Sequence, residues 1–288
     1  MKIKSQHLTH IFELNIAVLL ISTSGVLGRY ISMPPPITIW WRCIFAAFFL
    51  GLFVWYKKID LKIASKKDLT TIIFAGFFMG AHWVTYFYAL HLSNVAIGML
   101  SLFTYPVITA LLEPLFFKTK LSINQLFLSG LVVVGIYFLT PEMNFENSYT
   151  KGVLMGIISG VFYSLRNILT KKNISHFNAS KVMFYQMIVI VLFLWPVTIG
   201  VDYTGSSNWI RIVALALITT SIGHTLFVNS FKNFTISAVS IMSSMSPIYG
   251  ILFGILFLTE IPSKTTIFGG ILILATVVIE SFQSKKNK

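Results

Sequence analysis

ITIWWRCIFAAFFLGLFVWY, the stretch from Ile37 to Tyr56, contains a single charged side chain, Arg42. An α-helix rises about 1.5 Å per residue, so about 20 residues cover the roughly 30 Å of hydrocarbon in a bilayer. Two lysines, Lys57 and Lys58, follow immediately. An apolar run of this length that ends in basic residues is typical of a transmembrane helix whose C-terminal end faces the cytoplasm.

The composition of the whole chain agrees with a membrane location. Of its 288 residues, 56% are hydrophobic and 11% are charged, and the mean hydropathy is +0.80. Soluble domains carry about 25% charged residues. This chain therefore lacks the polar surface that a soluble enzyme, a nucleic-acid-binding module or a disordered segment needs. Its lone cysteine, Cys43, excludes an intramolecular disulfide and a cysteine-based metal site.

Nine further runs meet the same criterion, and short polar or proline-containing breaks separate them. Long runs with tight connections favour a helical bundle over a β-barrel, whose strands alternate over about ten residues. The first run is too long for a signal peptide and lacks a small-residue cleavage pattern, so we expect it to be retained. The ten predicted spans are 11–33, 37–56, 69–90, 95–117, 123–140, 152–170, 177–200, 209–231, 236–258 and 265–282.

Most basic residues fall on one side of this arrangement. The opposite side carries only Lys151, Arg211 and Lys264. Because lysine and arginine are retained on the cytoplasmic side during insertion, we expect a bacterial inner (plasma) membrane protein with both termini in the cytoplasm. The formal charge of +13 then reports orientation and not a nucleic-acid partner. The basic residues of the predicted cytoplasmic side are Lys2, Lys4, Lys57, Lys58, Lys62, Lys66, Lys67, Lys118, Lys120, Lys171, Lys172, Lys181, Lys232, Lys285, Lys286 and Lys288.

The sequence contains a weak internal repeat. Shifted by 141 residues, the segment 89–106 lies without gaps on the segment 230–247, which places Pro106 over Pro247. Each half of the chain then has a proline in the middle of its fourth span. Two halves of five helices each are the simplest account of this match.

Five is an odd number, so the second half enters the membrane from the opposite face. Such inverted repeats occur in many secondary transporters, with the substrate site near the midplane between the halves. We therefore predict an all-α integral membrane protein with ten transmembrane helices arranged as two inverted five-helix repeats, residues 1–145 and 146–288. A shift of 137 residues also places Arg29 over Arg166.

Two local motifs point to a known family. The stretch LTEIPSKTTIFGGILIL at 258–274 contains Glu260, and the second span contains WWRCIFAAFFL at 40–50. With the ten spans and the paired prolines, these resemble the EamA branch of the drug/metabolite transporter (DMT) superfamily. In the first half the place of the repeated glutamate falls on Thr119, and Glu113 appears instead. The resemblance implies a permease for small metabolites, with amino acid export as the leading activity and a cavity lined by the third, fourth, eighth and ninth spans.

Three arginines lie inside predicted spans, where an ionisable side chain is costly and is therefore a functional candidate. Arg29 lies near the outer end of the first span, Arg42 in the outer third of the second, and Arg166 near the inner end of the sixth. For Arg29 and Arg42, substrate attraction or gating competes with snorkelling; for Arg166, snorkelling to the cytoplasm is favoured. The repeat would place Arg29 and Arg166 at opposite mouths of an alternating pathway.

The glutamates near membrane segments allow fewer roles. Glu113 is either a proton-carrying or arginine-pairing carboxylate or an interfacial residue beside Lys118. We expect Glu13, Glu260 and Glu280, at the ends of spans, to face lipid headgroups.

Two proline-containing spans in matching places are the best pointer to a substrate site. A mid-membrane proline frees a carbonyl, which must find a partner or line a wet cavity. Serines recur at helical spacing in the ninth span, although such hydroxyls also bond to their own backbone or to a neighbouring helix. The candidates are Ser101, Tyr105 and Pro106 in the fourth span and Ser240, Ser244 and Pro247 in the ninth.

Histidine and aromatic side chains supply further candidates. His82 and Tyr86 are four residues apart and share a helix face, and with Trp83 they could wall a flat or cationic substrate. Ordinary aromatic packing is the alternative, and a histidine here is either a proton relay or a packed, hydrogen-bonded residue. The remaining candidates are Tyr163, Gln186, His224 and Asn229, in the sixth, seventh and eighth spans.

No catalytic or phosphate-binding motif appears in the sequence. We predict a secondary transporter and not an enzyme, with no cofactor or metal, which exports small polar metabolites by alternating access. Amino acids are favoured by the family resemblance, and the arginines favour a carboxylate or phosphate. A nucleotide-sugar or multidrug carrier of the same superfamily and an intramembrane lipid-acting enzyme are the alternatives. Proton coupling through Glu113, His82 or His224 stays open, as does the choice between monomer and homodimer.

Overall fold

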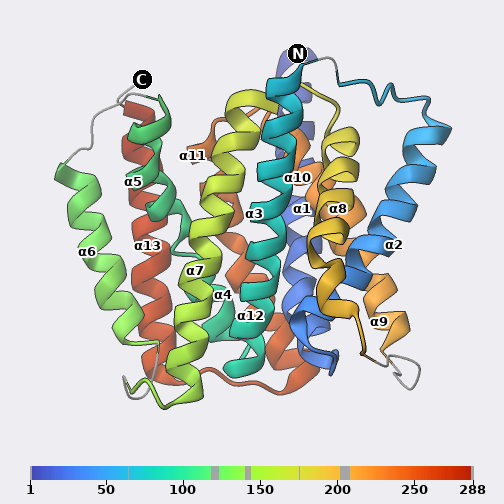
Figure 1. Cartoon of the computed structure of the whole chain (residues 1–288). Helices are drawn as coiled ribbons and strands as arrows, with labels where there is room; N and C mark the ends of the chain where they lie inside the picture. Colours follow the sequence, from blue (N-terminus) through green and yellow to red (C-terminus); the bar gives the residue numbers. More distant parts are fainter. Residues whose placement is uncertain are drawn as a thin grey trace.

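The structure is a computed structural model that describes residues 2–63, 65–117, 123–139, 144–174, 176–201 and 208–286. All regular structure in these ranges is helical, and the helices form a bundle with both termini at one face (Figure 1). The first helices are α1 (Lys2–Tyr30), α2 (Pro35–Tyr56), α3 (Lys66–Leu92), α4 (Val95–Leu102), α5 (Tyr105–Phe117) and α6 (Ile123–Tyr137). The others are α7 (Ser148–Leu169), η1 (Thr170–Ile174), α8 (Ala179–Leu194), η2 (Trp195–Thr198), α9 (Trp209–Ala214), η3 (Leu215–His224), α10 (Thr225–Ser230), α11 (Ile236–Ser243), α12 (Met245–Leu258) and α13 (Lys264–Lys286).

Seven helical segments in the described ranges are long and apolar enough to cross a membrane. Three shorter apolar helices, Ile123–Tyr137, Met245–Leu258 and Lys264–Ile279, occupy the places of the fifth, ninth and tenth predicted spans. Helix length therefore supports an all-helical membrane protein but does not establish the predicted count of ten. Large apolar side chains such as Trp55 and Leu115 are exposed on the outside of the bundle, as contact with lipid tails requires.

Polar residues and prolines in the short links end one helix and start the next. The Oδ1 atom of Asn94 accepts the N–H of Ile97 at 2.9 Å, and that of Asn178 accepts the N–H of Ser180 at 2.9 Å. Both side chains satisfy N–H groups that the first turn of a helix leaves unpaired. Pro35 opens α2, where a residue without an N–H costs nothing.

The two proline-containing spans are broken at matching places. The fourth consists of α4 and α5, which are separated at Phe103 and Thr104, just before Pro106. The ninth consists of α11 and α12, separated at Ser244, three residues before Pro247. Proline removes the N–H that would bond to the carbonyl four residues earlier, so a helix is weakest there.

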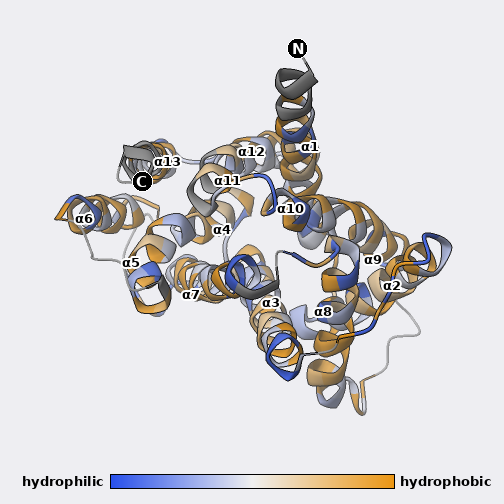
Figure 2. Cartoon of the chain, turned by 90° about the horizontal axis from the view of Figure 1, so that it is seen from above, coloured by the Kyte–Doolittle hydropathy of each residue, from blue (hydrophilic) through white to orange (hydrophobic). Residues whose placement is uncertain are grey.

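Helices that are distant in sequence pack together through the middle of the bundle. Helix α3 lies against α7, α2 against α8, and α1 against η3 and α12, so the two halves interlock (Figures 1 and 2). Glycine allows the close approach of α7 to the break in the fourth span. A Cβ on Gly156 would lie 1.8 Å from the Ser101 Oγ, and one on Gly160 would lie 3.1 Å from the carbonyl oxygen of Leu102.

The eighth predicted span is not a uniform α-helix. Between α9 and α10 the chain forms the π-helix η3, in which each turn is wider than in an α-helix. Thr219 and Thr220 are neighbours in sequence, and both donate to the carbonyl of Leu215, at 2.5 and 3.3 Å. π-Helical turns occur frequently at functional sites.

Candidate functional site

A small cavity lies where the interlocked helices meet. Its volume accessible to water is about 40 Å³, which is room for about three water molecules. This space is smaller than a typical metabolite. It is lined by Val18, Ile21, Ser24, His82, Trp83, Tyr86, Met99, Leu102, Phe103, Tyr105, Tyr163, His224, Phe227, Ser243 and Ser246.

These lining residues come from six predicted spans. The third, fourth, eighth and ninth spans all contribute, as the family resemblance implied. The first span adds Ser24 and the sixth adds Tyr163. Both halves of the chain therefore form the wall, and a relative movement of the halves would reshape the cavity.

The His82 side chain is held in one orientation by Ser159. The Ser159 hydroxyl donates to the backbone carbonyl of His82 at 2.8 Å, and His82 Nδ1 lies 2.7 Å from the same Oγ. Because the hydroxyl has a single proton, Nδ1 must be the donor in the second bond. A neutral His82 then presents Nε2 as an acceptor. The ring stacks on Tyr163 with centroids 4.4 Å apart.

Arg42 lies directly behind the cavity wall. Its Nε donates to the Thr220 Oγ1 at 2.7 Å and its Nη2 to the Thr219 Oγ1 at 3.0 Å. The guanidinium carbon lies 3.9 Å from the centroid of Trp83, whose ring in turn meets the ring of His224 edge-on at 5.2 Å. The wide turn of η3 allows two consecutive threonines to hold one arginine, which fixes its plane against Trp83.

Arg166, on α7, is the second fully buried arginine. Its Nη1 donates to the Asn167 Oδ1 and its Nη2 to the Gln186 Oε1, both at 3.0 Å, and Nη2 also lies 3.4 Å from Met183 Sδ. Tyr163, one helical turn earlier on α7, lines the cavity. The side chain is fully buried, so the predicted snorkelling of Arg166 to the cytoplasm is wrong.

Neither buried arginine has a carboxylate partner among the described residues, where the ion pairs are His10–Glu13 and Arg29–Glu260. Arg42 Nη1 and Arg166 Nε are buried without a hydrogen-bond partner. The same holds for two polar atoms of the cavity wall, Nδ1 of His224 and Oγ of Ser243. Polar groups without partners are costly to bury, and ionisable groups buried around a cavity are typical of a functional site.

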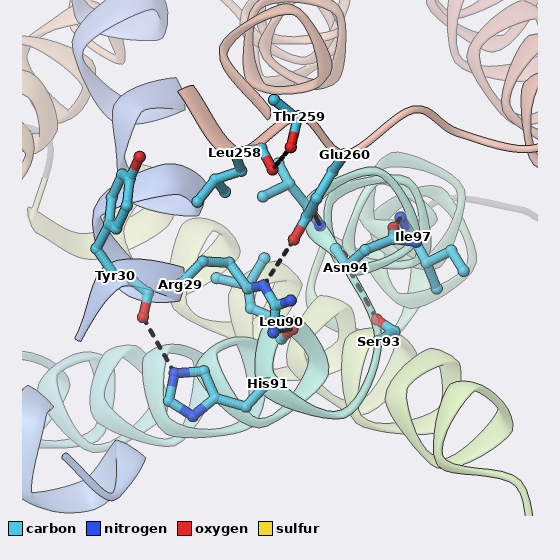
Figure 3. A network of polar contacts seen from close by, with 12 residues as sticks. Arg29, Tyr30, Leu90, His91, Ser93, Asn94, Ile97, Leu258, Thr259 and Glu260 are labelled. Carbon is cyan, nitrogen blue, oxygen red and sulfur yellow. Dashed lines mark hydrogen bonds and ion pairs between the residues drawn. The ribbon is translucent and has the colours of Figure 1, made fainter. Parts of the chain in front are cut away.

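A polar cluster closes the bundle at the face opposite the termini (Figure 3). Arg29 Nε donates to the Glu260 Oε1 at 2.8 Å, and Arg29 Nη1 donates to the Leu90 carbonyl at 3.2 Å. The second oxygen of Glu260 accepts the N–H of Val95, the first residue of α4, at 2.8 Å. Glu260 therefore links α1 and the start of α4, and the prediction that it faces headgroups is wrong. We call Arg29, Leu90, Val95 and Glu260 the Arg29–Glu260 cluster.

The backbone at Thr259 directs Glu260 into this cluster. Thr259 ends α12 in the left-handed conformation, with φ +55°, which reverses the chain so that the Glu260 N–H bonds to the carbonyl of Gly254 at 3.2 Å. A residue with a β-branched side chain adopts positive φ rarely. The turn places the glutamate back over α4 instead of toward the outside.

A related contact lies at the face that carries the termini. Lys171, in η1, donates to the carbonyl of Phe231 and, at 3.1 Å, to that of Phe234. Phe231 is the residue that the 141-residue shift places on Leu90, the carbonyl that accepts from Arg29. A cation at or just after the end of the first helix of each half thus meets the equivalent carbonyl at the end of the third predicted span of that half. The structure gives this contact to Lys171 and not to Arg166.

The other predicted residues are spread over several environments. Trp83, Tyr86, Tyr105, Tyr163, His82 and His224 line the cavity, and Gln186 lies behind it. Ser101 is buried but bonds to its own helix, to the Ile97 carbonyl at 2.7 Å. Ser244, Pro106 and Pro247 are buried at the helix breaks, whereas Glu113 and Asn229 are half-buried and outside the lining. The side chain of Ser240 lies outside the described part of the structure.

Sequence reasoning missed four polar residues of the site. Ser24, Ser243 and Ser246 line the cavity, and Ser159 orients His82. The four-residue spacing that selected Ser244 assumes an unbroken helix. The break at that residue changes the phase, so that its neighbours face the cavity instead. No group of three histidine, cysteine or carboxylate side chains that could hold a metal occurs in the described ranges.

The fold and the site define the class: a polytopic helical membrane protein with a cavity of aromatic, apolar and a few polar side chains between two interlocked halves. The model of the EamA-like transporter family matches residues 10–140 and 150–282, so the chain belongs to this family, whose fold is an inverted repeat.

Named relatives agree with this family. The chain is 24% identical to the "Uncharacterized transporter YxxF" of Bacillus subtilis (strain 168), over 95% of this chain and 90% of that protein. It is 20% identical to the pseudopaline exporter CntI of Pseudomonas aeruginosa, over 77% of this chain and 78% of that protein. A solved crystal structure superposes with a TM-score of 0.70 at 15% identity, covering 97% of this chain and 99% of the other. The first two are named as transporters, and the third is similar in fold.

Proposed function

We propose that this chain is a secondary transporter that exports a small polar metabolite by alternating access between its halves, residues 1–145 and 146–288. The observation that carries the proposal is the small cavity among buried side chains, whose wall comes from both halves and whose polar atoms include groups without partners. For such a cavity to become a transport pathway, it must open to each face of the membrane in turn, so each face needs contacts that can break. The Arg29–Glu260 cluster covers one face, and the contact of Lys171 joins helices at the other.

Family membership supports transport, and the name of the Pseudomonas relative supports export as the direction to test first. Amino acids are the first solutes to test, and nucleotide sugars and drugs are the second arm. A lipid-acting enzyme is disfavoured because the lining residues that the structure describes include no carboxylate to serve as an acid–base partner for the histidines.

Transport is tested with the purified full chain in proteoliposomes. Vesicles loaded with a labelled amino acid should release it faster than protein-free vesicles, and an imposed pH gradient tests proton coupling through His82, His224 or Glu113. Trp83→Ala should slow release at least about tenfold because it removes a wall of the cavity. Trp55→Ala is the matched control, since Trp55 is 78% exposed on the outside of the bundle. If no solute of either arm crosses faster than in empty vesicles, the proposal is wrong.

The proposed orientation places both termini in the cytoplasm of a bacterial inner membrane. A cysteine introduced at Lys62, in the link after α2, should react with an impermeant maleimide only from the inside. One at Phe145, in the link before α7, should react only from the outside. Both positions are exposed, so accessibility will not limit the reaction. The reverse labelling would overturn the orientation and leave the transport proposal standing.

A further inference from the structure

Two buried arginines beside the cavity bear on the charge of the solute. Arg42, on α2, and Arg166, on α7, belong to different halves, and both are fully buried. The described acceptors that hold them are neutral: two threonine hydroxyls for Arg42, and an asparagine, a glutamine and the Met183 thioether for Arg166. The protein therefore orients two positive charges at this site and neutralises neither with a described side chain.

Both charges act on the cavity itself. Arg42 packs against the lining residue Trp83, with its guanidinium carbon 3.9 Å from the ring centroid, and Arg166 lies one helical turn from the lining residue Tyr163. The wall offers Ser243 Oγ and His224 Nδ1 as unpartnered hydrogen-bonding atoms. It also offers hydroxyls and rings, but none of its described lining residues carries negative charge.

This arrangement distinguishes solutes by charge. A carboxylate or phosphate in the cavity is attracted by both arginines, whereas an ammonium group is repelled by both and finds no acid. At about 8 Å and an effective dielectric constant of about 20, one unit charge gains or loses roughly thirtyfold in affinity per arginine. A zwitterion gains at one end what it loses at the other.

We infer that the solute carried by this chain is a net anion at neutral pH, an inference that rests on the proposed transport function. The occupant is a small metabolite with more acidic than basic groups, which supplies the counter-charge that the described side chains around the two arginines lack. Neutral zwitterionic amino acids fit this site less well than acidic ones or dicarboxylates.

Matched solute pairs that differ in charge test the inference. We would measure counterflow in proteoliposomes, and thermal stabilisation of the detergent-purified chain, for glutamate against glutamine, succinate against succinamide, and glycerol phosphate against glycerol. The anion of at least one pair should be preferred at least about tenfold. The phosphate pair and the two carboxylate pairs distinguish the kind of acidic group.

Variants connect the preference to the two arginines. Arg42→Gln and Arg166→Gln should each lose most of the preference, and Arg42→Lys should keep it because the charge remains. Arg211→Gln is the control: Arg211, at the start of α9, bonds to Tyr30 and Asn208 and is outside the cavity lining. The melting temperature of each solute-free variant shows whether it has folded. If a glutamine variant does not fold, the Arg42→Lys variant and the solute pairs measured on the wild type still decide the test.

The outcomes separate the two proposals. Transport or stabilisation that favours the neutral member of every pair, or a preference unchanged in folded Arg42→Gln and Arg166→Gln, overturns the anion inference and leaves the transporter proposal intact. Stabilisation by anions without any transport supports the anion inference and overturns the transporter proposal. If no solute crosses or stabilises the chain, both fail.

Discussion

Replacing Glu260 by glutamine is the sharpest test of how the cavity is closed. The substitution keeps the size of the side chain and an oxygen that can accept a hydrogen bond. It removes the negative charge that faces Arg29 Nε at 2.8 Å and the N–H of Val95 at 2.8 Å. If the Arg29–Glu260 cluster holds the face opposite the termini closed, the variant should open there more often.

The size of the effect follows from the exposure of the pair. Two unit charges about 4 Å apart attract by about 4 kcal/mol at an effective dielectric constant of about 20, whereas fully exposed pairs contribute about 0–1 kcal/mol. The side chains of Arg29 and Glu260 are 30% and 18% exposed, between these limits. A carboxylate at the first N–H of a helix adds about 0.5 kcal/mol. We expect a loss of about 2 kcal/mol, which shifts the closed-to-open ratio about thirtyfold.

Accessibility of a cavity residue reports this ratio. Ser24 lines the cavity and is buried, so a Ser24→Cys reporter should react with an impermeant maleimide only when the cavity opens. The native Cys43 is fully buried and gives the background rate. In the Glu260→Gln variant, labelling from the face opposite a tagged terminus should accelerate about thirtyfold. Labelling from the other face should not accelerate.

Two further variants control this experiment. Glu146→Gln removes an exposed glutamate from the link before α7, at the same face, and should leave the labelling rate unchanged. Arg29→Gln should accelerate labelling like Glu260→Gln. The free energy of closing lost in the double variant should be smaller than the sum of the two single losses, because the two side chains share one interaction. A Glu260→Gln rate within twofold of the parent, or a fully additive double variant, would refute the gating argument.

Two packing predictions can be checked by thermal unfolding in detergent. Gly156→Ala should lower the free energy of unfolding by about 2 kcal/mol, since its Cβ would lie 1.8 Å from the Ser101 Oγ; Gly130→Ala, with nothing within 4 Å, should be neutral or stabilising. Equal melting temperatures for the two would contradict the close approach of α7. Thr220→Val should also cost about 2 kcal/mol, because a buried guanidinium loses the acceptor of its Nε. Ser221→Ala removes only a bond to its own helix and should cost about 0.5 kcal/mol or less, so a larger loss there would refute this account.

The sequence predicted the parts of this molecule that depend on local composition. Apolar length locates the membrane segments, and the helix breaks occur beside Pro106 and Pro247, because a missing N–H acts on its own helix. The cavity wall formed by His82 and Tyr86 also follows from a short spacing, since residues four apart share a face. Such inferences need no knowledge of how distant segments meet.

Other features depend on long-range contacts that composition does not encode. Glu260 lies at the end of a span, where a glutamate ordinarily faces water or headgroups. Its partner Arg29 is 231 positions away, and the turn at Thr259 brings the two together. Arg166 lies close enough to a predicted span end to suggest snorkelling, yet α8 packs over it and supplies Gln186. In both cases the tertiary neighbour decides the role.

The two faces of the bundle carry related contacts, and the face opposite the termini has an additional attachment. Arg29 and Lys171 each donate to the carbonyl that the repeat places at the same position, residue 90 or residue 231. An inverted repeat puts these equivalent contacts at opposite faces, so each can hold one end of a shared pathway. The Arg29 contact is reinforced by Glu260, which also fixes the first turn of α4 directly before the broken fourth span. In the proposed transport cycle, opening that face requires the glutamate to release both α1 and α4, so we expect this double attachment to make the face opposite the termini the harder one to open.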